Sequence, residues 1–115
     1  ILARGANDGL RGQPPQTTRA NLEAIVARLT AAGARVLLAG MRMPPNYGET
    51  FTRQFEAVFP AVARRANVAL VPFLLDGVAA DPTLNQADGL HPNAAGHRVI
   101  ADRLWPQLRP LLKKP

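Results

Sequence analysis

Apolar residues along this chain follow two different spacings. Residues 1–4 read as the end of a buried strand, and the continuous apolar runs 36–39 and 68–71 predict two more strands covered on both faces. Between and after these runs, apolar residues recur three and four positions apart, which predicts amphipathic helices. The helical stripes comprise Leu22, Ile25, Val26 and Leu29; Phe51, Phe55, Val58, Phe59 and Val62; and Val99, Ile100, Leu104, Leu108, Leu111 and Leu112.

Threonine, glycine and proline residues mark the expected helix ends. Thr17 or Thr18 is expected to cap the first helix, which Gly33 then ends. Pro60 is expected to kink the second helix or to divide it in two. Pro92 suits the first turn of the last helix, so it should constrain the loop that leads into that helix.

The order strand, helix, strand, helix, strand, helix predicts parallel βαβ units and therefore the α/β fold class. The 115 residues allow one domain at most. Three strands, one of them cut short, make an incomplete parallel sheet, and Ile1 falls within a predicted strand. We therefore expect a truncated or excised piece of a larger domain.

The composition excludes several classes of function. The chain has no cysteine, which excludes disulfides and thiol catalysis. No apolar run approaches the ~18 residues that a membrane span needs. The net charge of +6 comes mostly from arginines scattered singly along helical stretches, without aromatic residues interleaved for base stacking. We predict an arginine-rich solvated surface and no nucleic-acid partner.

The segment Asp88-Gly89-Leu90-His91-Pro92 is the first candidate for chemistry. An aspartate three residues before a histidine can fold back onto the imidazole Nδ1–H. That contact would fix the tautomer and leave Nε2 free to take a proton from a hydroxyl. The alternative is an Asx turn or a helix cap beside a surface histidine. The spacing alone leaves both interpretations open.

Asn7 is the second candidate, because it follows a predicted strand at the edge where open α/β sheets build their sites. Its amide can donate a hydrogen bond to a developing oxyanion, or it can hold a left-handed turn between Gly5 and Gly9. His97 lies off the helical face of His91 and is expected on the surface. No His, Asp or Glu cluster has metal-ligand spacing and the sequence has no glycine-rich phosphate loop, so neither a metal nor an organic cofactor is expected.

The chain contains no serine, and none of its six threonines is N-terminal or lies in a strand-to-helix elbow. A nucleophile that His91 could activate is therefore missing from these 115 residues. This mismatch points to a catalytic domain whose nucleophile lies on another segment.

Three segments make the chain resemble the SGNH (GDSL-type) hydrolases, and more narrowly their bacterial acyl-CoA thioesterase I, lysophospholipase L1 and arylesterase branch. They are residues 5–12 (Gly-Ala-Asn-Asp-Gly-Leu-Arg-Gly), 43–48 (Met-Pro-Pro-Asn-Tyr-Gly) and 88–93 (Asp-Gly-Leu-His-Pro-Asn). The resemblance covers essentially the whole chain. It implies a three-layer α/β/α sandwich with a parallel, flavodoxin-like sheet. Residues 1–115 would be the incomplete C-terminal portion of a single such domain.

The resemblance also implies roles for individual residues. Asp88 would be the acid of a catalytic triad, His91 its general base, and Asn7 the side-chain donor of an oxyanion hole. The serine of the family's Gly-Asp-Ser block would lie upstream, on an N-terminal segment of the same domain. A loop similar to one that shapes the family's acyl-binding groove consists of Pro45, Asn46 and Tyr47.

One segment departs from the branch. Ala3-Arg4 occupies positions where the branch usually has an acidic and an apolar residue, so either this strand end is more exposed or its packing differs.

The sequence thus predicts a serine-dependent hydrolase of acyl esters or thioesters, with the serine-bearing segment as its partner. Two alternatives stay open: an inactive fragment or nicked half that needs complementation, and a basic binding module without enzymatic activity. The resemblance suggests a periplasmic or secreted location, which the residues themselves do not define.

Overall fold

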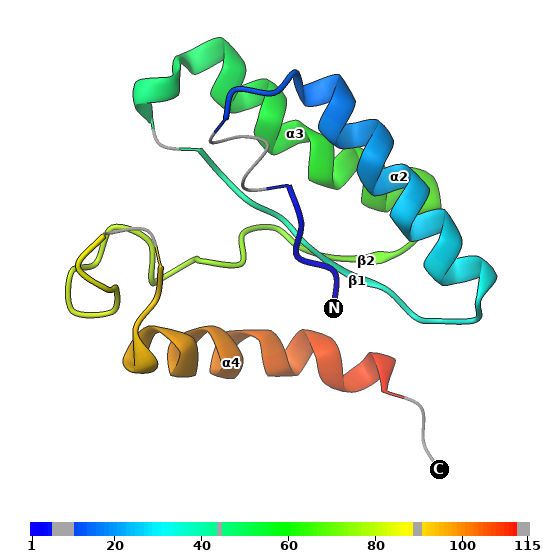
Figure 1. The fold of residues 1–115 in the computed structure, drawn as a ribbon. Helices are drawn as coiled ribbons and strands as arrows, with labels where there is room; N and C mark the ends of the chain where they lie inside the picture. The colour runs from blue at the N-terminus through cyan, green and yellow to red at the C-terminus, as the bar shows by residue number, and fades with distance from the viewer. Residues whose placement is uncertain (6–10, 44, 89–90, 113–115) are drawn as a thin grey trace. The chain divides into compact units, whose positions relative to one another are not determined.

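The computed structural model describes residues 1–5, 11–43, 45–88 and 91–112, and the side chain of Pro45 lies outside that description. The chain divides into two compact units, Ile1–Phe73 and Leu74–Pro115. The first unit contains a small parallel sheet and two long helices, and the second contains a series of turns followed by one long helix (Figure 1).

The sheet of the first unit is parallel, as the alternation of strands and helices predicted. Strand β1 (Leu37–Ala39) pairs in parallel with β2 (Ala69–Val71). Leu2 extends the sheet beyond β1: its N–H donates to the Leu37 carbonyl oxygen at 2.9 Å, and its carbonyl oxygen accepts from the Ala39 N–H at 2.8 Å. The expected parallel arrangement is confirmed, although the first segment contributes a single bridge and not a full strand.

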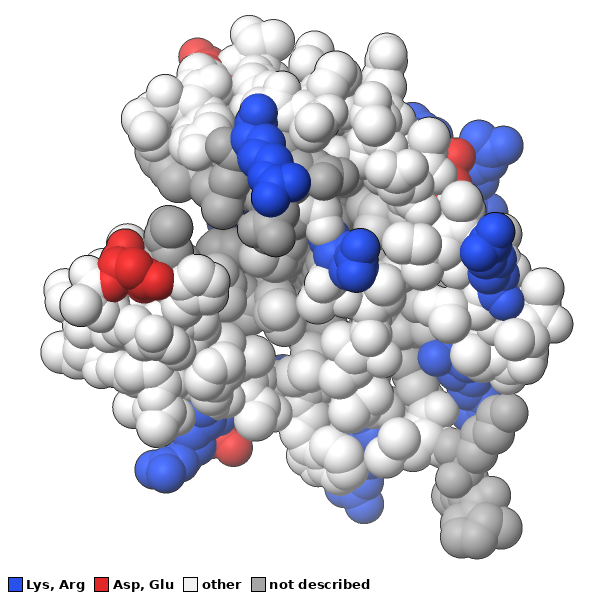
Figure 2. Space-filling model, viewed as in Figure 1, with Lys and Arg blue, Asp and Glu red and all other residues white. Residues whose placement is uncertain are grey.

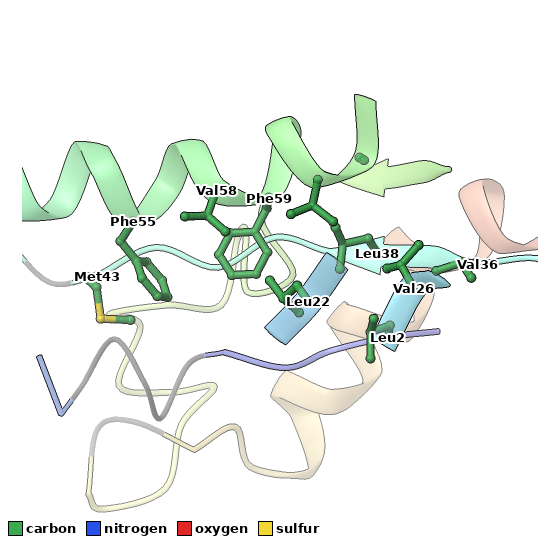
Figure 3. Close-up of a cluster of buried hydrophobic side chains, with 11 residues drawn as sticks. Leu2, Leu22, Val26, Val36, Leu38, Met43, Phe55, Val58 and Phe59 are labelled. Carbon is green, nitrogen blue, oxygen red and sulfur yellow. The ribbon is translucent and has the colours of Figure 1, made fainter. Parts of the chain in front are cut away.

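The core of the first unit lies where α2 (Pro15–Ala31) and α3 (Glu49–Ala66) pack side by side against one face of the sheet (Figure 1). Leu22, Phe59 and Leu38, which come from the two helices and β1, are fully buried and point into one cluster (Figure 3). The rest of that cluster consists of Leu2, Val26, Val36, Met43, Phe55, Val58, Val62 and Ala63. The helical spacing in the sequence therefore identified the buried faces of both helices, except that Leu29 of the first stripe is exposed.

The starts and interiors of these helices differ from expectation. Pro14 is the cap residue of α2, which begins at Pro15, so Thr17 and Thr18 lie inside the helix and do not form the cap. Pro15 fits the first helical position because its fixed φ matches the helix and its missing N–H would have no helical partner in the first turn. Pro60 does not divide α3, which continues across it because buried residues on both sides pack into the core.

Two glycines occupy places that other residues could not fill without strain. Gly33 follows α2 with a φ of +84°, and the Ala34 N–H reaches back to the Leu29 carbonyl oxygen at 3.0 Å, which ends the helix as expected. Gly40 follows β1, and a Cβ atom there would collide with the carbonyl oxygen of Pro72. The backbones that leave β1 and β2 therefore run in direct contact.

In the second unit, turns occupy residues 74–84, and Asn85 and Pro92 form an antiparallel bridge. Helix α4 (Ala94–Leu108) follows, and the short 3-10 helix η2 (Arg109–Leu111) extends it. The expectation that Pro92 lies in the first turn of this helix is wrong. Asn93 is the cap residue, so Pro92 lies one residue before the cap.

The basic side chains appear as separate spots on the face drawn in Figure 2, and several pair with nearby acids. Arg19 lies 3.0 Å from Glu23, and Arg103 lies 3.3 Å from Asp76. Exposed pairs of this kind contribute little stability, because solvent screens them. No helix in the described part of the chain has both the length and the apolar character needed to span a bilayer.

Candidate active site

Asp88 and His91 contact each other directly in the loop that precedes α4. Oδ2 of Asp88 lies 2.6 Å from Nδ1 of His91, and Oδ1 accepts a hydrogen bond from the His91 backbone N–H at 3.0 Å. One carboxylate therefore holds both the backbone and the ring of the same residue. The two interpretations that the spacing left open occur together, because the local turn positions the histidine while the ring contact orients it.

The imidazole is open on its other side. The side chain of His91 is 72% exposed and that of Asp88 is 44% exposed. Within residues 1–5, 11–43, 45–88 and 91–112, Nε2 of His91 has no hydrogen-bond partner. A carboxylate at Nδ1 favours the tautomer that carries its proton there, which leaves the Nε2 lone pair available. The arrangement can therefore accept a proton at Nε2.

Asn85 fixes the shape of the chain leading to this pair. Its Nδ2 donates to the carbonyl oxygens of Val78 and Asp81, each at 2.8 Å. The next residue, Gln86, also restrains the loop, because its N–H donates to the His91 carbonyl oxygen at 2.7 Å. These bonds tie the backbone on either side of the loop together and so define where the imidazole stands.

Asn93, on the carboxyl-terminal side of His91, also holds this loop in place. Its Oδ1 accepts from the Gly96 N–H at 2.9 Å and caps α4, while its Nδ2 donates to the Thr83 carbonyl oxygen at 3.0 Å. Gly96 allows a close approach, since a Cβ atom there would collide with the Leu84 carbonyl oxygen. The start of α4 is thereby fastened to the turn before the loop.

Sequence reasoning did not identify these supporting residues. Asn93 entered it only as the last residue of the segment 88–93, and Asn85 and Gly96 did not enter it at all. The one available signal was the density of side-chain amides around the histidine, at Asn85, Gln86 and Asn93.

Asp81 belongs to the turn and not to the proton-accepting pair. Its Oδ1 accepts hydrogen bonds from the Thr83 hydroxyl at 2.6 Å and from the Thr83 N–H at 2.9 Å. These bonds, the hydroxyl first, hold the pKa of Asp81 below its usual value because they favour the ionised carboxylate.

The other predicted site residues belong to the first unit. Asn46 and Tyr47 lie in the 3-10 helix η1 (Pro45–Tyr47), where Asn46 is exposed and Tyr47 is half-buried with its ring stacked 6.3 Å from that of Phe51. Asn7 and the side chain of Pro45 lie outside the described residues. The structure thus brings Asp88 to His91 and places Asn46 and Tyr47 together in one turn.

The turn η1 follows β1, and the chain leaving a parallel strand's carboxyl end is where α/β proteins build their sites. Arg42 and Phe73 follow the carboxyl ends of β1 and β2, and the guanidinium of Arg42 lies 5.1 Å from the centre of the Phe73 ring.

His97 is exposed on α4, as expected. The described residues contain no group of three or more His, Cys, Asp or Glu side chains that could hold a metal ion.

Comparison with known proteins places this chain in a family. The model of the GDSL-like Lipase/Acylhydrolase family matches residues 1–99. Esterase TesA of Pseudomonas aeruginosa is 43% identical over 112 residues, which are 97% of this chain and 56% of the relative. Thioesterase 1/protease 1/lysophospholipase L1 of Escherichia coli K12 is 42% identical over 112 residues, or 97% of this chain and 54% of the relative. An arylesterase of Vibrio mimicus is 37% identical over 102 residues, covering 89% of this chain and 51% of the relative.

Solved structures of related esterases are also similar to this chain. The crystal structure of TesA superimposes with a TM-score of 0.91 at 42% identity and covers 97% of this chain and 63% of its own. AlinE4, an SGNH-hydrolase family esterase, superimposes with a TM-score of 0.71 at 37% identity over 96% of this chain and 58% of its own. The chain belongs to the GDSL-like lipase/acylhydrolase family. It spans about half the length of the curated relatives it matches.

These findings confirm the resemblance and the expected fold class. The helices and the small parallel sheet are those of an incomplete α/β fold of the SGNH type.

Proposed function

We propose that this chain supplies the acid–base half of a serine hydrolase that cleaves acyl esters or thioesters. The contact between Asp88 Oδ2 and His91 Nδ1 is the observation that carries the proposal, together with the open Nε2. The relatives named esterase, thioesterase 1/lysophospholipase L1 and arylesterase support the reaction class. The chain would then be the C-terminal portion of a single domain, with the serine on an N-terminal segment.

In the proposed reaction, His91 Nε2 removes the proton of the serine hydroxyl as the serine oxygen attacks the acyl carbonyl carbon. The tetrahedral intermediate collapses when the C–O or C–S bond breaks and the imidazolium returns the proton to the leaving alcohol or thiol. Water then repeats the sequence on the acyl-enzyme and releases a carboxylic acid. Asp88 keeps the ring oriented and stabilises its charged form throughout.

Asn7 is proposed as a donor to the oxyanion of the tetrahedral intermediate, where one such donor contributes about a hundredfold to the rate. The turn of Pro45, Asn46 and Tyr47 is proposed as part of the wall that receives the acyl chain. The half-buried Tyr47 ring, continuous with the aromatic stack of Phe51 and Phe55, would present an apolar surface there.

The absence of serine from the 115 residues supports a second candidate, namely that the chain by itself is inactive and acts only after complementation. Both candidates share the same chemistry and differ in whether the nucleophile is delivered by another polypeptide.

The experiment is an assay of the chain alone and of the chain assembled with a serine-bearing segment. We expect no hydrolysis of aryl esters or acyl thioesters, and no labelling by a serine-directed phosphonate, from the 115 residues alone. The chain assembled with the serine-bearing segment should show both the hydrolysis and the phosphonate labelling. Stoichiometric phosphonate labelling of the pure chain, or an inert assembly that is correctly folded, would contradict the proposal.

A further inference from the structure

In the second unit, one arginine of α4 reaches back to a turn 27 residues earlier in the chain. Nη1 of Arg103 donates to Oδ2 of Asp76 at 3.3 Å. The guanidinium also lies against Gly77, since a Cβ atom built on this glycine would be 2.9 Å from Cζ, Nε and Nη2 of Arg103. Three atoms of the planar group are equally near that position, so the guanidinium lies flat on the glycine. Arg103 therefore holds the turn by both charge and packing.

The backbone of this turn has an unusual conformation on both sides of Val78. Gly77 has a φ of +79°, which glycine adopts without strain. Ala80 has a φ of +65° although it carries a Cβ atom, and a residue with a side chain adopts this conformation only at an energetic cost. Such a conformation persists where surrounding contacts hold it. The turn thus depends on support from outside its own backbone.

The supported turn carries a carbonyl group that fixes the loop of the candidate site. The carbonyl oxygen of Val78, the residue after Gly77, accepts from Nδ2 of Asn85 at 2.8 Å. Val78 is fully buried. The N–H of Gln86, the residue after Asn85, donates to the His91 carbonyl oxygen at 2.7 Å. The path from Gly77 to His91 therefore consists of neighbouring residues and two hydrogen bonds.

Helix α4 is attached to these turns at two separate places. At its start, the Asn93 N–H donates to the Leu84 carbonyl oxygen at 2.9 Å, and a Cβ atom on Gly96 would collide with the same oxygen. From Gly96 to Arg103 the helix rises ~10 Å. A single attachment would let the turns pivot on the helix, and the second attachment at Arg103 prevents that movement. Because His91 lies on the loop between the turns and the helix, both attachments define its position.

We propose that Arg103 is a positioning residue that keeps His91 where its Nε2 can take the proton of the serine. The proposal rests on the proposed function, because the position of the imidazole affects the rate only if His91 is the general base. Arg103 acts through the turn and Asn85 and takes no direct part in the reaction. A small misplacement of a catalytic group can lower a rate up to about a hundredfold. An exposed ion pair contributes little stability, so losing Arg103 should lower the rate and not the stability.

The first test is the measurement of kcat and KM for Arg103→Gln in the chain assembled with the serine-bearing segment. We expect kcat to fall about tenfold and KM to change less than about twofold. The urea midpoint of the chain should hardly move. Arg103→Lys keeps the charge near Asp76 but lacks the flat group that covers Gly77, so its kcat should lie between those of Arg103→Gln and the parent.

Amide hydrogen exchange of the chain alone gives a second readout, which needs no activity. The Gln86 amide, which donates to the His91 carbonyl oxygen, should exchange about fivefold faster in Arg103→Gln because the turn opens more often. The Ile100 amide lies within α4 and should be unchanged. Unfolding of the whole unit would accelerate both amides equally, and that result would overturn the proposal because Arg103 would then be merely structural.

Arg98→Gln is the matched control, because Arg98 is an exposed arginine of the same helix and forms no ion pair within the described part of the chain. Its kcat and its Gln86 exchange should equal those of the parent. If the parent assembly is active and Arg103→Gln leaves either quantity unchanged, or Arg98→Gln lowers kcat equally, the inference about Arg103 is wrong and the proposed function stands. A correctly folded but inert parent assembly would instead contradict the proposed function, and this inference with it.

Discussion

At the scale of single residues, Asp88 uses both of its oxygens as acceptors, one for the His91 backbone N–H and one for the ring. An amide has one acceptor and one donor. In Asp88→Asn, the amide oxygen can keep the backbone bond, while the amide NH₂ then faces Nδ1. That donor stabilises the tautomer whose proton is on Nε2, which can no longer accept a proton from a hydroxyl.

The prediction is a reversal of tautomer without loss of fold, and it can be measured on this chain alone. Nitrogen-15 NMR above the pH of imidazole titration should show the proton on Nδ1 in the parent chain and on Nε2 in Asp88→Asn. His97, which is exposed and has no side-chain hydrogen bond among the described residues, should be the same in both proteins. A proton that stays on Nδ1 in Asp88→Asn would show that Asp88 does not set the tautomer.

Asp81 gives a second prediction at this scale. Its pKa is lowered in the folded chain, so its contribution to stability is present above the unfolded pKa and is lost as the pH falls through the lowered folded value. Thr83→Val removes the hydroxyl donor, keeps the backbone N–H, and should raise the pKa of Asp81 toward its usual value. Carbon-13 NMR of the carboxyl group measures this directly. No change on substitution would mean that the hydroxyl bond is not formed in solution.

At the scale of elements, the loop before α4 depends on Asn93, which both caps the helix and binds the preceding turn. Asn93→Ala should lower the free energy of unfolding by about 1–3 kcal/mol, since a cap and side-chain hydrogen bonds are lost. Asn93→Asp keeps the cap and removes only the Nδ2 donor, so it should cost less. Urea unfolding measures both variants.

Gln107→Ala, at an exposed position of α4, is the control for Asn93 and should stay within about 0.5 kcal/mol of the parent. If Asn93→Ala proves as mild as Gln107→Ala, the loop is held by other contacts.

The elements differ in how far the sequence could predict them. β1 and β2 were predictable because a continuous apolar run has few other uses than a buried strand. The cap of α2 was not, because proline and threonine both suit a helix start and only the backbone decides between them. The hydrogen bonds of Asn85 could not be predicted either. Its amide reaches carbonyl groups four and seven residues away, and the positions of those groups depend on the turns between them.

At the scale of the whole molecule, the first unit owes its stability to a core shared by two helices and the sheet. Phe59 is fully buried and meets Phe55 edge to face, with ring centres 5.4 Å apart. Phe59→Ala should cost about 3–5 kcal/mol, through lost burial and the cavity left behind. Leu29→Ala, at a position 36% exposed, should cost much less. Equal effects in urea unfolding would show that this cluster is not the core.

The candidate site as a whole shows the limit of local pattern. Asp88 and His91 were predictable as a pair because three residues of separation suffice to bring them into contact. The roles of Asn7 and of the turn with Tyr47 depend on tertiary placement, which spacing along the chain does not encode, and they remain predictions that rest on the family.

The proposed function depends most on His91 acting as the general base of an acyl hydrolase. The direct measurement is kcat for His91→Ala and His97→Ala in the chain assembled with the serine-bearing segment. His91→Ala should lower kcat by about three orders of magnitude or more, because the serine keeps its proton, while His97→Ala should leave it nearly unchanged. Activity that survives His91→Ala and is abolished by His97→Ala would contradict the assignment.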